Sequence, residues 1–163
     1  MSRVALVLAA GEGTRMKSGK PKVLHRICGK PMISWVLDAL DALLEEGLVQ
    51  RILVVVGSGG GEVKAELGER TEFVIQEERR GTGHAVMVAA PLIREDEVLV
   101  LTADSPLITA ATLRRLCLLH EAEKPAVTML GAVMDDPTGY GRIKRDEKGA
   151  VVGVVEESEA RPE

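Results

Sequence analysis

Apolar and polar positions alternate along the chain in two different patterns. Short runs of β-branched and aliphatic residues predict strands over residues 4–9, 51–56, 72–75, 98–102 and 126–130. Longer segments between them predict helices over residues 32–46, 62–67, 84–90 and 110–123. Strands that alternate with helices are typical of βαβ units. The pattern therefore predicts an α/β fold, Rossmann-like, with a mostly parallel sheet between two helical layers.

The helical and strand segments carry further local signals. Residues 32–46 place five apolar side chains on one stripe, and Gly47 follows as a stop. Thr109 is a plausible N-cap for the helix over residues 110–123. Residues 4–9 are apolar throughout, so we expect this strand to be buried on both faces, and residues 98–102 are expected to form another buried strand. Ile143 and residues 151–155 flank a turn at 146–149, which predicts an antiparallel hairpin near the carboxyl end.

A glycine-rich, basic loop follows the first predicted strand. It runs from Leu8 to Lys22 and contains Gly11 and Gly13, whose backbone N–H groups can converge on phosphate oxygens. A dinucleotide fingerprint would need a third glycine where Met16 stands, and the spacing of a P-loop is absent. The loop is therefore interpreted as an anion site of another kind, with charge supplied by Arg15, Lys20 and Lys22.

Two further candidates lie where predicted strands end. Gln76 carries an amide that could pair with the O4 and N3–H edge of uracil, and backbone groups near Gly81 and Thr82 could share that work. Asp104 is a candidate Mg²⁺ ligand, because this ion commonly takes one or two protein carboxylates with phosphate and water. In a parallel sheet, ligands bind at the carboxyl ends of strands, where Gly11, Gln76 and Asp104 all fall.

Bulk properties narrow the class of protein. The 163 residues suit one globular domain, and the net charge of −4 argues against nonspecific nucleic-acid binding. No apolar run approaches the roughly 20 residues that span a bilayer, and no signal peptide is evident, so we expect a cytoplasmic protein without membrane contact. Cys28 and Cys117 lack metal-ligand spacing and are expected to be reduced and buried. His25, His84 and His120 are expected to be structural.

The loop and three later segments together resemble the sugar-nucleotide pyrophosphorylases, a family of nucleotidyltransferases. The matching segments are residues 8–32, Gln76 with 81–85, 103–107, and 139–143 with Glu156. Their order and spacing agree along nearly the whole chain, and residues 81–85 and 139–143 resemble the branch that uridylates N-acetylglucosamine-1-phosphate. The resemblance implies a nucleotidyltransferase fold over residues 1–163.

The resemblance also implies a reaction and roles for its residues. N-acetylglucosamine-1-phosphate would attack the α-phosphorus of UTP in line, with Mg²⁺ and without a covalent intermediate. Arg15 and Lys22 would be catalytic, and Asp104 would bind the metal. The sugar would contact Ala103, Gly141 and Glu156. The nucleotide would contact Leu8, Ala9, Ala10, Gly11, Gly13, Thr14, Gln76, Gly81 and Thr82.

The match stops before the end of the family's uridyltransferase domain. That domain continues past this chain's last residue and is followed in the family by a β-helix acetyltransferase domain, so we expect a domain incomplete at its carboxyl end. A trimer made by the β-helix is then not expected. Two alternatives stay open: a non-catalytic or partially active nucleotide-binding fragment, and a pyrophosphorylase for another sugar-1-phosphate or nucleotide.

Overall fold

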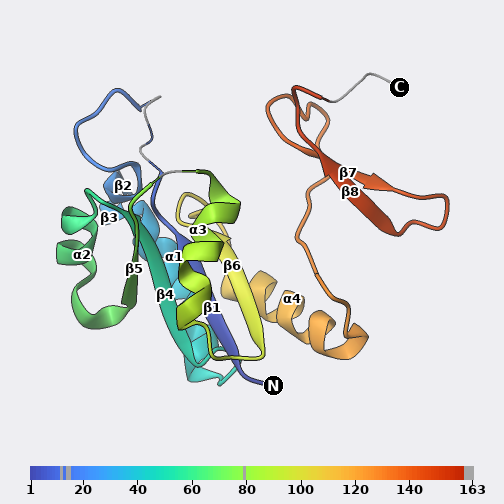
Figure 1. The fold of residues 1–163 in the computed structure, drawn as a ribbon, viewed down its shortest axis with the longest axis horizontal. Helices are drawn as coiled ribbons and strands as arrows, with labels where there is room; N and C mark the ends of the chain where they lie inside the picture. Colours follow the sequence, from blue (N-terminus) through green and yellow to red (C-terminus); the bar gives the residue numbers. More distant parts are fainter. Residues whose placement is uncertain (12, 14–15, 79, 160–163) are drawn as a thin grey trace. The chain divides into compact units, whose positions relative to one another are not determined.

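Four parallel strands form the central sheet, in the order β5-β4-β1-β6 (Figure 1). They are β1 (Arg3–Leu8), β4 (Arg51–Gly57), β5 (Glu72–Gln76) and β6 (Glu97–Thr102). The computed structural model describes residues 1–11, 13, 16–78 and 80–159. The chain divides into two units, residues 1–124 and 125–163, and the sheet belongs to the first.

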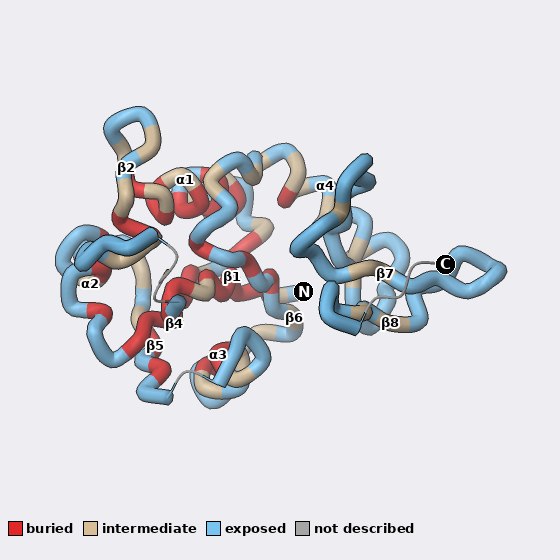
Figure 2. The backbone as a smooth tube through the Cα atoms, turned by 90° about the horizontal axis from the view of Figure 1, so that it is seen from above, coloured by how far each residue is buried: buried red, intermediate tan, exposed pale blue. Residues whose placement is uncertain are grey.

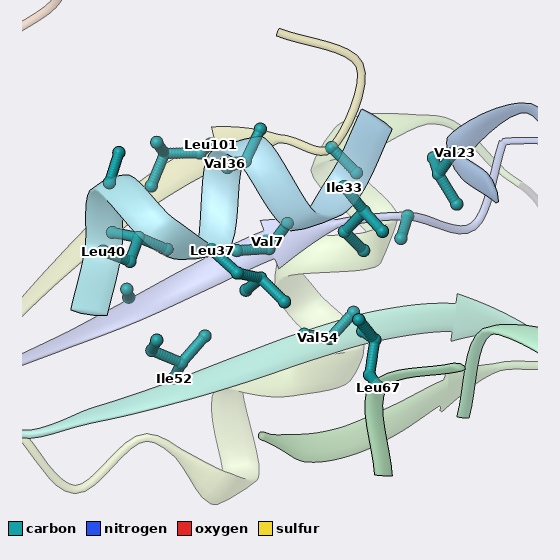
Figure 3. Packing of buried hydrophobic residues seen from close by; sticks show 14 of the residues in the cluster. Val7, Val23, Ile33, Val36, Leu37, Leu40, Ile52, Val54, Leu67 and Leu101 are labelled. Atoms are coloured by element: carbon teal, nitrogen blue, oxygen red, sulfur yellow. The ribbon is translucent and has the colours of Figure 1, made fainter. Parts of the chain in front are cut away.

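Helices cover both faces of this sheet, as the alternating pattern predicts. They are α1 (Met32–Glu45), α2 (Gly61–Leu67), α3 (Thr82–Ala89) and α4 (Ala110–Glu123). On one face Ala5 and Val7 of β1 pack in a cluster with residues of α1, α2 and α4, part of which Figure 3 shows. On the other face Val4 and Leu6 pack in a cluster with residues of α3. The first unit therefore has three layers, and its fold class agrees with the prediction.

Burial is greatest in the middle of the sheet. Residues 4–7 of β1 and 53–55 of β4 are fully buried, and both strands lie in the red centre of Figure 2. Each has a strand on both sides, so apolar side chains on both of its faces are covered. The apolar run in residues 4–9 is explained by this position.

The remaining elements of the first unit are short. A hairpin of β2 (Arg26–Ile27) and β3 (Lys30–Pro31) follows the 3₁₀ turn Lys22–Leu24, and its two turn residues, Cys28 and Gly29, both have positive φ. Two more 3₁₀ turns, Gly68–Arg70 and Ala90–Leu92, follow α2 and α3. Thr109 caps α4 as predicted, because its hydroxyl accepts a hydrogen bond from the backbone N–H of Thr112 at 3.2 Å.

The second unit contains the predicted antiparallel hairpin. Its strands are β7 (Arg142–Arg145) and β8 (Val151–Val155), joined by a turn in which Asp146 accepts hydrogen bonds from the backbone N–H groups of Lys148 and Ala150.

Three expectations about burial and strands are wrong. Within the described chain, residues 126–130 form no strand and join none of its sheets, and Val127 is 75% exposed. The edge strand β6 is buried on one face only: α3 lies over β1, β4 and β5, which leaves Val98 and Val100 40% and 43% exposed. Cys28 is exposed because it lies at the tip of the β2–β3 hairpin, whereas Cys117 is buried.

Candidate functional site

A cavity of about 240 Å³ opens at the carboxyl ends of β1, β5 and β6. After β1 the chain continues to β4 on one side, while β6 returns on the other side of β1. Loops that leave in opposite directions from neighbouring strands leave a crevice between them, which is where open α/β sheets bind ligands. The cavity is lined by Leu8, Ala9, Ala10, Gly11, Lys22, Val23, Gln76, Gly81, Thr82, Ala85, Thr102 and Asp104.

The loop after β1 supplies the first wall of the cavity. The backbone N–H of Ala9 donates to the carbonyl of Val55 at 2.8 Å, which fixes the chain as it leaves the sheet. A Cβ on Gly11 would meet no atom within 4 Å, so this cavity-lining glycine leaves open space for a ligand. Gly13 has a φ of +62°, and a Cβ there would lie 2.4 Å from the Cβ of Lys22. A glycine at 13 therefore lets the Lys22 side chain pass close to the loop.

Lys22 and Asp104 form an ion pair in this cavity. Nζ of Lys22 donates to Oδ2 of Asp104 at 2.6 Å, and both side chains are about one third exposed or more, 35% and 40%. This hydrogen bond lowers the pKa of the Asp104 carboxyl below its ordinary value, and a bond from the Thr102 hydroxyl lowers it further. Asp104 is held next to β1 because the N–H of Ala103 donates to the Leu8 carbonyl at 3.0 Å.

The metal-ligating side chains at the cavity fit a hard divalent cation whose remaining ligands are phosphate oxygens and water. Within the part of the chain that the structure describes, no three His, Cys, Asp or Glu side chains gather as a metal cluster. Asp104 offers one ionised carboxylate at the cavity. Magnesium commonly binds through one or two carboxylates while phosphate oxygens and water complete its shell. Asp104 therefore suits a metal that arrives with a phosphate ligand.

Gln76 lies at the end of β5 on the opposite wall. Its side chain is buried, and Nε2 donates to the Gly81 carbonyl at 3.3 Å and lies 2.9 Å from Nδ1 of His84. From the sequence, the Gln76 amide was predicted to present both a hydrogen-bond donor and an acceptor to a base. The structure instead engages the amide nitrogen with the first turn of α3, and His84 is the unexpected partner.

The structure brings most of the predicted nucleotide site together. Nine of the predicted residues line this same cavity: Leu8, Ala9, Ala10, Gly11, Lys22, Gln76, Gly81, Thr82 and Asp104. Gly13 lies against Lys22, and Ala103 is fully buried next to Asp104. Thr14 and Arg15 lie outside the described residues. Gly141 and Glu156 belong to the second unit, in which a Cβ on Gly141 would lie 4.0 Å from Oε2 of Glu156.

Four residues at the site were missed by sequence reasoning. Val23, Ala85 and Thr102 line the cavity, and His84 contacts Gln76. Thr102 ends an apolar strand two residues before Asp104, and this position was a usable signal. The direction in which Val23, His84 and Ala85 point depends on the orientation of their helical turns, which apolar periodicity does not give.

Comparison with known protein families identifies the class. Residues 5–146 match the family described as MobA-like NTP transferase domain. The chain belongs to this family. Membership of this family agrees with the nucleotidyltransferase fold that the sequence predicts.

Two relatives match nearly the whole of this chain and about a third of their own length. "Bifunctional protein GlmU" of Thermoanaerobacter pseudethanolicus is 52% identical over 161 residues, which are 98% of this chain and 34% of the relative. The protein of the same name from Heliobacterium modesticaldum is 52% identical over 160 residues, 97% of this chain and 34% of the relative. The chain spans about a third of the length of these relatives.

Solved structures share the fold. A putative glucose-1-phosphate thymidylyltransferase from Bacillus anthracis superposes with a TM-score of 0.71 at 18% identity, covering 96% of this chain and 65% of that one. A Mycobacterium tuberculosis protein crystallised with manganese has a TM-score of 0.59 at 22% identity, covering 74% of this chain and 60% of that one.

Among the described residues, no helix has the length and apolar character needed to cross a membrane.

Proposed function

We propose that this chain transfers UMP from UTP to N-acetylglucosamine-1-phosphate, with release of pyrophosphate. The observation that carries the proposal is the cavity in which Gly11, Lys22, Gln76 and Asp104 meet, from three different strand ends. Two relatives named GlmU, at about half identity over nearly the whole chain, support this choice of substrates.

The proposed reaction is a direct displacement at the α-phosphorus. An oxygen of the sugar phosphate forms the new P–O bond, and the bond to the β-phosphate breaks, so that pyrophosphate leaves with the electron pair. The attacking phosphate is already an anion, so the protein has to supply positioning and charge and needs no nucleophile of its own. The ionised Asp104 carboxylate would hold Mg²⁺, which supplies charge neutralisation at the phosphates when bound.

Lys22 has the charge and the place to act on the phosphates. Its ammonium lies in the cavity, paired with Asp104. A lysine acts as a mobile point charge, so it can turn from the carboxylate to a phosphate oxygen where negative charge develops. Arg15 as the group that holds pyrophosphate, and Ala103, Gly141 and Glu156 as sugar contacts, stay predictions from the family resemblance.

One assay tests the proposal. The purified chain is mixed with UTP, N-acetylglucosamine-1-phosphate and Mg²⁺, and pyrophosphate and the nucleotide sugar are followed, while UTP binding is measured separately by calorimetry. We expect both products, with losses of about 100-fold or more for Asp104→Asn and Lys22→Met, as is usual when a charge that stabilises the transition state is removed. Asp135→Asn, an exposed site in the second unit, is the control.

The two measurements separate the possible failures. UTP binding without product would show a nucleotide-binding fragment and contradict the enzymatic proposal for this chain. If the chain neither binds UTP nor forms product, the proposed nucleotide site itself is contradicted. Faster turnover with another sugar phosphate or nucleotide would contradict the proposed substrates but not the proposed type of reaction. Mg²⁺-dependent turnover that survives Asp104→Asn would rule out the metal assignment.

A further inference from the structure

The Gln76 amide is oriented by two neighbours from the start of α3. Its nitrogen Nε2 lies 3.3 Å from the Gly81 carbonyl oxygen and 2.9 Å from Nδ1 of His84, and the side chain is only 3% exposed. A carbonyl oxygen can only accept, so the atom of Gln76 that faces Gly81 must be the nitrogen. The Gly81 contact thus fixes which end of the amide points toward α3.

The same logic assigns the state of His84. An amide nitrogen has hydrogens to donate and no lone pair to accept with, so Nδ1 of His84 must be the acceptor. The tautomer that fits this contact carries its ring hydrogen on Nε2. Both N–H bonds of the Gln76 amide are engaged by these two partners. The carbonyl oxygen Oε1 is consequently the polar atom of Gln76 left to meet a ligand.

We propose that His84 is a specificity-positioning residue, which holds the Gln76 amide so that the site presents an acceptor and not a donor to the nucleobase. The inference rests on the proposed function, in which the base is uracil. Uracil has a single ring donor, N3–H, flanked by two carbonyl acceptors, so an acceptor at Gln76 suits N3–H. Cytosine has a lone pair at N3, so its N3 and the Oε1 of Gln76 would be two acceptors that repel each other.

His84 contributes because an amide has nearly the same shape in both orientations. If Nδ1 were lost, only the longer contact to Gly81 would oppose a flip that brings the NH₂ group toward the base. A flipped Gln76 would accommodate cytosine N3 and reject uracil N3–H. Removing the acceptor at 84 is therefore expected to change the choice between two pyrimidines, and not only the strength of binding.

Three variants test this on the whole chain. His84→Leu removes the acceptor, His84→Asp places a carboxylate oxygen at about the distance of Nδ1 along the side chain, and Gln76→Leu removes the amide. The measurement is the ratio of dissociation constants for UTP and CTP, by calorimetry in Mg²⁺. His84 is partly exposed, so these replacements leave the core untouched, and circular dichroism checks the fold.

We expect His84→Leu to lower the preference for UTP over CTP by about three- to tenfold, which corresponds to one ordinary hydrogen bond. His84→Asp should keep the preference, although its added charge weakens both nucleotides together. A merely structural role for His84 would change the two affinities in parallel, or would make the two variants alike. Either result would overturn the proposal.

The Gln76→Leu variant separates this inference from the proposed function. If Gln76→Leu leaves the ratio unchanged, Gln76 does not distinguish the bases and the proposed uridine site is wrong. If Gln76→Leu lowers the ratio while His84→Leu does not, the uridine site stands and the role of His84 is overturned.

Discussion

At the scale of single residues, Gly13 controls where Lys22 lies. The φ of +62° is unfavourable for a residue with a side chain, and a Cβ there would overlap the Lys22 stem. Gly13→Ala should therefore lower the free energy of unfolding by about 1–3 kcal/mol, measured by urea unfolding, and weaken UTP binding. Gly19→Ala is the matched control, because a Cβ at 19 meets no atom within 4 Å. Equal effects of the two changes would contradict this reading of Gly13.

The Lys22–Asp104 pair predicts a specific acid dependence of stability. The pKa of Asp104 is lowered in the folded chain, mainly by the Lys22 hydrogen bond. The contribution of the pair is therefore complete above the unfolded value of about 4 and is lost as the pH falls through the lower folded value. Because both side chains are more than one third exposed, the contribution is about 1 kcal/mol or less.

Urea unfolding from pH 7 down to pH 3 measures this dependence. The Asp104→Asn and Lys22→Met variants should start less stable than the wild type and converge with it in acid, and the double variant should match either single one. Curves that stay parallel to the wild type at every pH would show that the pair does not stabilise the fold.

At the scale of elements, α1 is held by its apolar stripe. Leu37 is fully buried between α1 and the sheet (Figure 3). Leu37→Ala should cost about 2–5 kcal/mol of unfolding free energy, because a cavity remains where the side chain packed. Leu119→Ala, on the half-exposed side of α4, should change it by less than about 0.5 kcal/mol. A small loss for Leu37→Ala would mean that the core closes around the gap.

Most strands and helices of the first unit could be predicted from the sequence. The strands of the parallel sheet were predicted to within one or two residues. Buried strands appear in the sequence as short apolar runs, whereas amphipathic helices show apolar residues three or four positions apart. The rule that parallel strands end at one edge also placed Gln76 and Asp104 near the loop after β1. Residues 126–130 and the outer face of β6 were mispredicted because pairing and cover depend on neighbours distant in sequence. The Gln76–His84 contact has the same origin, since it depends on how α3 is turned.

At the scale of the whole molecule, burial is distributed unevenly along the chain. Within the described chain, no residue of 125–159 is buried, whereas β1 and β4 are almost completely buried (Figure 2). Native-state hydrogen exchange should therefore show the slowest amides in β1 and β4, which open only with global unfolding. Amides of β7 and β8 should exchange far faster, because a two-stranded hairpin is marginally stable alone. Equal protection of both strand sets would contradict this division.

The contrast between the two cysteines provides a chemical readout of the same core. Cys28 is exposed on the β2–β3 turn, while Cys117 packs in the cluster shared by α1 and α4, and burial raises the pKa of its thiol. The cysteine thiolate is the nucleophile that attacks a thiol reagent, so the exposed Cys28 should react with one equivalent at once in the native chain. The second equivalent can react only when α4 separates from the sheet. The rate of that second modification would thus measure how often the core opens under conditions in which the protein stays folded.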